Sequence, residues 1–506
     1  MKKLTGITAA AFALAIATLL AACSGGGQQP AGDTQPPGST TEAETVTETT
    51  TKYADNLPDD LDFDGGEVRV LYREANVEEF YIPEATGEIV DDAINDSIRE
   101  VEERLNLKVA VTPRIGTAYS DRLKYNDHIA QNVLAGDDVY EWCDIMADML
   151  RISVGQGVLA DLQKVPYLEP DKPWYTAGLT EEGILGGGLW CLLGDFSLGY
   201  LRDTFCLYFN KTLTEAYGVD DLYKTVEGGD WTIDRAAEVS KKAASDVNGD
   251  GIIDLEDKLG FVLRDNYHLC GFMTCTDVNY YSRDSAGGWQ YTYGSEHDIK
   301  AVTKVHSLLR GTPGNYLFEG TRTSSANQEV YNSIASNFMA GEVMIMTAQM
   351  NDAVTDLRNM ESDYGILPFP KLDEAQEDYI TSSRTTHSAM VMPLICSEKG
   401  REIAGAFIEA LAAKNHGTVI PAYFELALKT KYSRDNESTV MYDLIHDSTR
   451  LSFSYLYAQI ATKSPTELFI AGCKEPDKFA SSLAAAHEAN KASFDQYIKS
   501  VEEINK

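Results

Sequence analysis

Residues 246–257 carry side chains whose types and spacing suit a metal ion. Oxygen donors recur at alternate positions, Gly251 occupies the sixth position, where such a loop must turn sharply, and a carboxylate closes the twelfth. A hard cation needs several oxygens converging on one point, so the pattern predicts a calcium loop. The alternative is an Asn/Asp/Gly-rich turn that holds no metal. The predicted ligands are Asp246, Asn248, Asp250, the carbonyl of Ile252, Asp254 and Asp257.

Catalytic motifs are absent from the sequence. Glycosidases use two carboxylates, but with 78 acidic residues in the chain such a pair can always be chosen, so its presence is no specific evidence for a glycosidase. The eight histidines are scattered without metal-ligand spacing, and no GxSxG, HExxH or Walker-type phosphate loop occurs. The sequence therefore predicts a protein that is not an enzyme.

The net charge argues against nucleic acid as a partner. The formal charge of −35 would repel a phosphate backbone over most of the surface, so we expect no nucleic-acid partner. At 506 residues, the chain is long enough for two or more domains.

The N-terminus has the features of an export signal. Lys2 and Lys3 precede an apolar run that ends Leu-Ala-Ala directly before Cys23. This run is short and rich in alanine, which favours a cleaved signal over a membrane span. Small residues before a cysteine resemble a bacterial lipobox, so residues 1–22 are predicted to be a lipoprotein signal peptide and Cys23 the lipidated residue. The alternative is a cysteine within an ordinary secretory signal.

Seven cysteines follow Cys23, an odd number that cannot all pair within one chain. None shows CxxC spacing. Cys270 and Cys275 could form a bridge, but we expect free, buried thiols.

Residues 23–65 are predicted to be a disordered acidic tether, because they are rich in Gly, Gln, Pro, Ser, Thr and Glu and nearly free of aliphatic residues before Leu57. Beyond this tether, the sequence pattern predicts an alternation of strands and amphipathic helices. The strands are expected at 67–72, 107–112 and 144–148, and the helices at 91–106 and 121–135. This alternation predicts an α/β layer with parallel strands, in which binding residues lie beyond the carboxyl ends of the strands. Tyr72, Arg73 and Asp148 occupy such positions, although each could equally be a loop residue that faces water.

Several segments, in this order along the chain, resemble the family 1 extracellular solute-binding proteins. These proteins are the lipoprotein receptors of bacterial ABC importers, many of them for sugars. The family's F-x-x-G-x-x-A-M segment is matched at 338–346, with Val343 and Met344 in place of its small residue and Met, and its G-x-x-P-x-P strand exit at 363–370. The other matching segments are residues 205–213, 229–232, 246–260, 388–393 and 400–413.

This resemblance implies a two-lobed α/β architecture, the type II periplasmic-binding-protein fold, with a ligand cleft between the lobes. The first lobe would comprise residues 66–173 and 380–414. The second would comprise residues 174–370 and 415–506 and include the loop at 246–257. Crossovers would lie near residue 173 and within 369–380 and 414–423. Ligand would be trapped by hinge closure.

Sugars are bound by aromatic faces and by polar side chains that hydrogen-bond hydroxyl groups. With 27 tyrosines and five tryptophans, the chain has many possible aromatic platforms. We expect Trp190, Tyr200 and Trp289 near the cleft, although packing in the core or hinge is the commoner role of such residues. Asp195 and Arg384 complete the expected polar contacts, with Tyr72, Arg73 and Asp148.

The predicted function is that of a monomeric receptor, lipid-anchored to the outer face of the cell membrane, which delivers a small soluble ligand to an ABC permease. The ligand would be an oligosaccharide. The alternatives are a secreted carbohydrate-active enzyme and a solute-binding protein for a non-sugar ligand such as a peptide. A scaffold-docking module is disfavoured because the calcium-type loop occurs only once.

Overall fold

The first sheet is built from strands that lie far apart in the sequence. In the computed structural model, which describes residues 54–322, 324–429 and 436–505, its strand order is β13-β3-β1-β2. Of residues 425–429 and 436, the backbone alone is described. β1 (Gly66–Arg73) pairs in parallel with β2 (Leu107–Arg114) and β3 (Trp142–Met146), whereas β13 (Ser388–Val391) runs antiparallel to β3.

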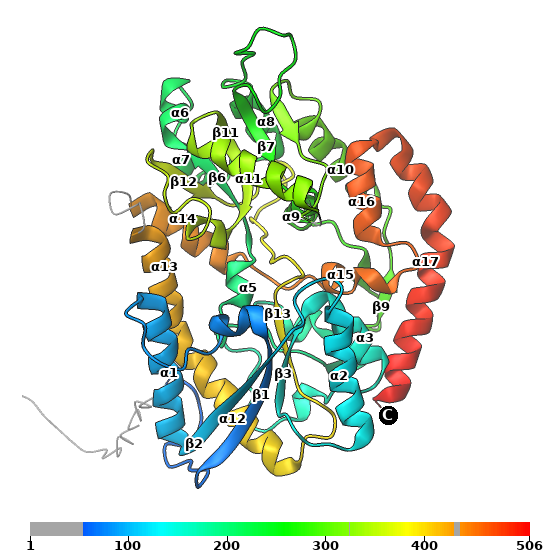
Figure 1. The fold of residues 1–506 in the computed structure, drawn as a ribbon. Coiled ribbons are helices and arrows are strands. Elements are labelled where there is room, and N and C mark those ends of the chain that lie inside the picture. The colour runs from blue at the N-terminus through cyan, green and yellow to red at the C-terminus, as the bar shows by residue number, and fades with distance from the viewer. Residues whose placement is uncertain (1–53, 323, 430–435, 506) are drawn as a thin grey trace, which may run out of the picture. The chain divides into compact units, whose positions relative to one another are not determined.

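The helices between these strands confirm the predicted alternation. α1 (Ile89–Leu105) connects β1 to β2, and α2 (Arg122–Ala135) connects β2 to β3. α1 buries Ile94, Ile98, Val101 and Leu105, because their spacing places them on one face. α12 (Glu398–His416) follows β13 and packs on α1 and β1. These elements form the first lobe, which lies in the lower part of Figure 1.

The second sheet has the strand order β10-β7-β11-β6-β12. β7 (Leu259–Leu263) is parallel to β10 (Asn315–Leu317) and β11 (Val343–Gln349). β6 (Phe205–Asn210) is antiparallel to β11 and to β12 (Tyr364–Leu367). Two small hairpins, β4 (Ile184–Leu185) with β5 (Gly188–Leu189) and β8 (Tyr281–Arg283) with β9 (Trp289–Tyr291), lie outside the two main sheets.

Helices of the second lobe begin at well-defined caps. The Thr232 side chain accepts a hydrogen bond from the N–H of Arg235 (3.2 Å) at the start of α8 (Ile233–Ser240). Ser295 forms a capping box with Asp298 at the start of α10 (Glu296–Leu309). Over both lobes, the helices between α2 and α12 are α3 (Leu150–Gly155), α4 (Leu179–Glu182), α5 (Gly199–Arg202), α6 (Lys211–Ala216), α7 (Leu222–Glu227), α8 (Ile233–Ser240), α9 (Leu269–Cys275), α10 (Glu296–Leu309) and α11 (Ser325–Met339). The helices after α12 are α13 (Val419–Lys429), α14 (Asn436–Asp447), α15 (Phe453–Leu456), α16 (Pro465–Lys474) and α17 (Pro476–Ile504).

The chain first crosses between the sheets at residues 203–205, about thirty residues later than predicted. Residues 174–203 stay with the first sheet, since the Leu192 N–H donates to the Met390 carbonyl (2.8 Å). This crossing segment pairs with residues 382–384, where the chain returns to the first lobe, through an isolated β-bridge between Thr204 and Ser383. Two hydrogen bonds flank this bridge, from the Phe205 N–H to the Ser382 carbonyl (3.0 Å) and from the Arg384 N–H to the Asp203 carbonyl (3.0 Å).

The remaining links between the lobes also differ from the prediction. α13 packs on α1 and so belongs to the first lobe, whereas α14 packs on β12 and belongs to the second. α17 lies against α10 and α16 of the second lobe, yet it also contacts α3 of the first, where the Tyr497 hydroxyl donates to the Arg151 carbonyl (2.6 Å). Figure 1 shows this helix running beside both sheets. Residues 415–506 are therefore not confined to one lobe.

The described end of the predicted tether is packed rather than disordered. Asp55 is buried in an ion pair with Arg104 (2.6 Å), and Leu57 and Phe63 are also buried. The Gly65 N–H donates to the Asn106 carbonyl (2.8 Å). Residues 54–65 thus belong to the folded unit, which spans residues 51–506. The predicted signal peptide, Cys23 and the rest of the tether lie outside the described residues.

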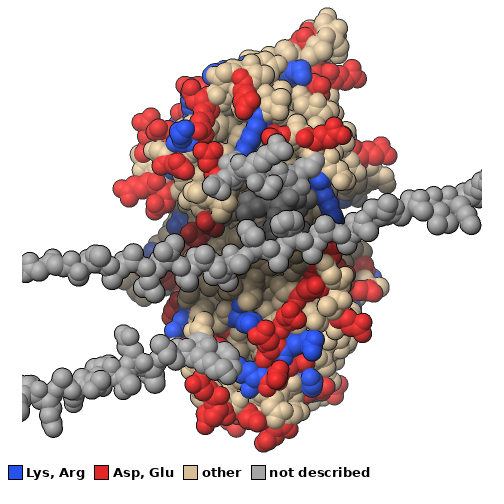
Figure 2. Space-filling view, turned by 90° about the vertical axis from the view of Figure 1, so that its left-hand side faces the viewer, with Lys and Arg blue, Asp and Glu red and all other residues tan. Residues whose placement is uncertain are grey.

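The described cysteines are all buried and unpaired, as predicted, so Cys270 and Cys275 do not form a bridge. Within the described ranges, no helix is both long and apolar enough to cross a lipid bilayer. Carboxylates are spread over both lobes on the face shown in Figure 2, in keeping with the acidic composition.

Candidate functional site

Polar side chains gather where the parallel strands of the two sheets end. Arg73 is the last residue of β1, and Asp148 follows β3. On the second lobe, Arg264 and Asp265 directly follow β7, and Gln349 ends β11. Since the carboxyl ends of parallel strands are the usual binding edge of an open α/β sheet, this region is the candidate ligand site.

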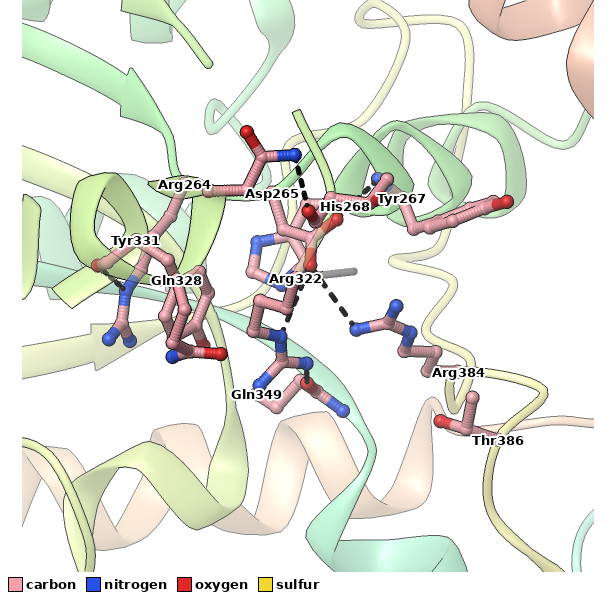
Figure 3. Close-up of polar contacts among 12 residues, drawn as sticks. Arg264, Asp265, Tyr267, His268, Arg322, Gln328, Tyr331, Gln349, Arg384 and Thr386 are labelled. Atoms are coloured by element: carbon pink, nitrogen blue, oxygen red, sulfur yellow. Dashed lines mark hydrogen bonds and ion pairs between the residues drawn. The ribbon is translucent and has the colours of Figure 1, made fainter. Parts of the chain in front are cut away.

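Asp265 is the centre of this cluster (Figure 3). Its carboxylate is fully buried. One oxygen accepts from the Tyr267 N–H (2.9 Å), and the other contacts Arg322 Nε (3.3 Å) and Arg384 Nη1 (3.5 Å). Burial alone would raise the pKa of Asp265, but Arg384 and the other positive neighbours hold it below its usual range. Asp265 therefore stays ionised and orients two guanidinium groups.

Two tyrosine rings support the guanidinium groups. Arg264 and Arg322 lie over the ring of Tyr331, at 3.7 and 4.5 Å from its centroid, and Arg384 lies over Tyr267 at 5.4 Å. Arg264 is fully buried and forms ion pairs with Asp352 (3.3 Å) and Asp356. Arg322 and Arg384 are partly exposed, so these two can reach a ligand.

His268 supplies a neutral group beside the same carboxylate. Burial lowers its pKa to about 3, so the ring is uncharged at neutral pH. Its Nδ1 lies 2.8 Å from the Thr347 hydroxyl, and its buried Nε2 has no hydrogen-bond partner among the described residues. The ring therefore orients neighbours without adding charge to the site.

The crossover segments complete this wall of the site. The carboxylate of Asp203 accepts from the Thr386 hydroxyl (2.8 Å) and from the side-chain amide of Gln349 (3.1 Å), which ties both crossovers to the end of β11. A cavity of about 220 Å³ opens here, and Asp203, Arg322, Tyr331, Gln349 and Thr386 are among its lining residues. A ligand in this cavity would contact both a crossover and the second lobe.

The first-lobe wall is held by ion pairs. Arg73 and Asp144, both buried, are 2.7 Å apart, and Arg73 also donates to the Ser388 hydroxyl (2.8 Å). Asp148 pairs with Arg122. Burial raises the pKa of Asp148 to about 6, although Arg122, Arg73, Arg151 and Arg384 act to lower it.

Of the eight predicted ligand-binding residues, the structure brings Arg73, Asp148 and Arg384 together. The segment that directly follows Arg384 accepts a hydrogen bond from the Asp148 N–H at the Thr385 carbonyl (3.0 Å) and one from the Arg73 guanidinium at the Thr386 carbonyl (3.4 Å). Tyr72 is instead a core residue, stacked on Phe80 at 5.2 Å and bonded through its hydroxyl to Ser197 (3.0 Å). Its side chain points to the opposite face of the strand from Arg73.

The two predicted tryptophan platforms are packing residues. Trp190 is buried in the β4–β5 hairpin and donates to the Leu185 carbonyl (2.8 Å). Trp289 stacks on Phe453 at 3.7 Å and donates to the Ile184 carbonyl (2.9 Å). These contacts occupy the ring faces and N–H groups on which a sugar would depend.

Asp195 and Tyr200 line a separate cavity of about 480 Å³, formed by residues 170–181, residues 194–204 and the end of α14. There, Asp195 accepts from His416 Nδ1 (2.7 Å) and lies 3.9 Å from His446 Nε2. The structure therefore separates these two residues from the Asp265 cluster.

Tyr267, Tyr331, Arg322 and Asp265 are not among the residues predicted for the site. A signal existed for Asp265, since it lies two residues after the continuous apolar run that forms β7 and obeys the same strand-end rule as Asp148. Nothing local marks Arg322, because its place depends on how residues 318–322 lie beside the end of β7, where the Phe318 N–H donates to the Leu263 carbonyl (3.0 Å).

The predicted calcium loop has the donor chemistry of a calcium site but a different internal arrangement. The Asp246 carboxylate accepts from the N–H groups of Gly249 (2.6 Å) and Gly251 (2.9 Å). Asp257 accepts from those of Val247 (2.8 Å), Asn248 (3.4 Å) and Asp254 (3.1 Å). Among the described residues, no three or more His, Cys, Asp or Glu side chains converge as a metal site. Asp257 thus joins the two ends of the loop, together with the backbone bridge between Ser245 and Lys258.

Comparison with solved structures shows a maltose-binding-protein-like, two-lobed α/β fold. The galacto-N-biose/lacto-N-biose I-binding protein of an ABC transporter from Bifidobacterium longum, in complex with lacto-N-biose, matches with a TM-score of 0.54 and 12% identity over 87% of this chain and 98% of its own. A family 1 extracellular solute-binding protein from Bifidobacterium longum subsp. infantis matches with a TM-score of 0.51 and 15% identity over 85% and 100%. The maltose-binding periplasmic protein of Listeria monocytogenes, in complex with maltose, matches with a TM-score of 0.51 and 13% identity over 87% and 98%.

A scan of protein-family models and a search of curated proteins give no match. The fold prediction is therefore confirmed by structural similarity alone.

Proposed function

We propose that this chain is the extracellular substrate-binding protein of an ABC importer and that it captures an oligosaccharide. The observation that carries the proposal is the strand-end cluster around Asp265, which offers aromatic rings and polar groups beside the crossovers of a two-lobed fold. Neighbours with the same fold include proteins in complex with lacto-N-biose and with maltose.

The cluster has the groups that a sugar requires. Tyr267 is 37% exposed, and its ring can take the C–H face of a pyranose. Arg322, Arg384 and Asp203 offer charged groups, whose hydrogen bonds to hydroxyls are stronger than those between neutral partners, and Gln349 adds an amide. Closure of the lobes over the ligand would exclude water from these contacts.

Export and anchoring belong to the same proposal. The lipobox-like residues before Cys23 support cleavage at that position and lipidation of its thiol, which would hold the receptor at the outer face of the membrane beside a permease. Mass spectrometry of the native protein tests this part: a diacyl or triacyl mass on an N-terminal Cys23 supports it, whereas a cleaved, unlipidated terminus contradicts it.

Isothermal titration calorimetry of purified residues 51–506 against a panel of neutral and charged oligosaccharides tests the ligand class, with a peptide library as the comparison. Saturable one-to-one binding of an oligosaccharide without product formation is the expected result. Binding of peptides alone, or turnover of a glycan detected by chromatography, would overturn the proposal.

A further inference from the structure

Arg322 and Arg384 share one acceptor. Both approach the same oxygen of Asp265, at 3.3 and 3.5 Å, while its other oxygen is occupied by the Tyr267 N–H. Hydrogen bonds between guanidinium groups and carboxylates are ordinarily about 2.7–2.9 Å long. One oxygen therefore leaves two guanidinium groups incompletely paired.

Three other carboxylates near the cluster are already engaged. The oxygens of Asp203 accept from Thr386 and Gln349, and Asp352 and Asp356 pair with the buried Arg264. Arg322 has one further contact, to the Gln349 side-chain oxygen at 3.4 Å. A guanidinium group has five N–H donors, so both Arg322 and Arg384 keep donors for an incoming group.

The two side chains are also more exposed than those of Arg264 and Arg73. Arg264 and Arg73 are buried in ion pairs, whereas the side chains of Arg322 and Arg384 are 34% and 13% exposed. Figure 3 shows both guanidinium groups on the same side of Asp265, near Gln349 and Thr386. They lie over the rings of Tyr331 and Tyr267, which hold the groups in place.

We infer that the ligand is an oligosaccharide that carries an anionic group, a carboxylate or a sulfate ester, and that Arg322 and Arg384 bind this group. The inference rests on the proposed function and narrows it. A planar guanidinium matches two oxygens of such an anion at once, which one shared oxygen of Asp265 does not provide. Arg322 and Arg384 would then determine specificity between charged and neutral sugars.

Titration calorimetry with matched ligands tests this inference. One set is lactose, 3′-sialyllactose and 3′-sulfolactose, which share a core and differ in the anion; another is trigalacturonate with its carboxyl-reduced counterpart. We expect an anionic member to bind at least about tenfold more tightly than its neutral counterpart, and the preference to shrink at high salt. The two lactose derivatives distinguish a carboxylate from a sulfate.

Arg322→Gln and Arg384→Gln are the informative variants. Each leaves Asp265 with one arginine, so the fold should persist, which the melting temperature checks. Each should weaken binding of the anionic ligand about tenfold more than it weakens binding of the neutral counterpart. Arg235→Gln, at a surface pair with Asp220, is the matched control.

Equal affinity for anionic and neutral members, or a preference that survives in both variants, would overturn the inference while the proposed oligosaccharide function stands. Binding of peptides and of no glycan would overturn the proposed function, and the inference with it.

Discussion

At the scale of the residue, the ion pair between Arg73 and Asp144 should contribute strongly to stability. Both side chains are at most 1% exposed, so loss of the guanidinium leaves a carboxylate without its counter-ion in the core. Arg73→Met should lower the free energy of unfolding by about 3–5 kcal/mol, measured by urea denaturation.

Two variants make that result interpretable. Arg235→Met removes a surface pair and should cost less than about 1 kcal/mol. Arg73→Met combined with Asp144→Leu should recover part of the loss, because no charge then remains buried. A cost for Arg73→Met as small as that for Arg235→Met would show that Asp144 is stabilised by other groups.

Glu79 should make stability depend on pH. Burial raises its pKa to about 7, although Arg202 opposes this, while its ordinary value is 4.5. The folded chain therefore binds the proton more tightly than the unfolded chain. The contribution of Glu79 is fully present below pH 4.5 and is lost as pH rises through 7.

Glu79→Gln imitates the protonated side chain and removes this dependence. Relative to the parent chain, its free energy of unfolding should rise between pH 4.5 and 8, by no more than about 3 kcal/mol. Urea melts across this range measure the difference, with Glu488→Gln on α17 as an exposed control. A difference that is flat with pH, or that falls, would contradict a raised pKa.

Sequence reasoning found part of the candidate site. Arg73 and Asp148 are predictable, because a strand followed by a charged residue places that charge at the binding edge. Tyr72 shows the limit of the rule, since adjacent strand residues point to opposite faces and the pattern gave no reason to choose between them. Arg322 could not be found locally, because its contact with Asp265 depends on how two distant segments of the second lobe pack together. Tyr267 lies only two residues after Asp265, but it was missed among the 27 tyrosines.

At the scale of the element, the repeating β–α pattern of residues 66–146 was predictable from hydrophobic periodicity. So were strands at 205–210 and 258–263, which are continuous buried runs. The β4–β5 and β8–β9 hairpins were not foreseen as packing elements, since their strands are two or three residues long and their tryptophans gave a stronger signal than their turns.

The loop at 246–257 offers a direct test at this scale. If it binds calcium as predicted from its sequence, calcium should raise the melting temperature of the parent chain above its value in chelator, and Asp250→Ala should abolish that rise. Asp257→Ala should lower the melting temperature in both conditions, because its carboxylate closes the loop through three N–H groups.

Differential scanning fluorimetry measures these shifts, and Asp495→Ala on exposed α17 is the control. Equal melting temperatures with calcium and with chelator would mean that Asp257 alone performs the role expected of the metal.

At the scale of the whole molecule, the two-lobed fold was predictable but the boundaries between the lobes were not. Residues 174–203 have no long strand of their own, so the lobe to which they belong is decided by single contacts, such as the hydrogen bond between Leu192 and Met390. Helical periodicity likewise gives no indication that α13 and α14 pack on different lobes, because an amphipathic face does not specify its partner.

The long helix α17 has a consequence for how the molecule loses its structure. Its first half is held by the second lobe, where it packs on α10 and α16 and Phe479 meets the ring of Tyr293 with 5.9 Å between ring centroids. Its end reaches the first lobe, where the Asn505 amide donates to the Gly186 carbonyl (3.2 Å). Neither sheet can melt without releasing one half of this helix. The two lobes should therefore unfold in a single cooperative event, with equal calorimetric and van't Hoff enthalpies.

Scanning calorimetry of residues 51–506 checks this expectation. Two resolved heat-absorption peaks in the parent chain would contradict it. Tyr497→Phe combined with Asn505→Ala removes two of the hydrogen bonds that hold the end of α17 to the first lobe, and should broaden or split the transition. The two lobes would then unfold in separate thermal transitions, because α17 would no longer couple them.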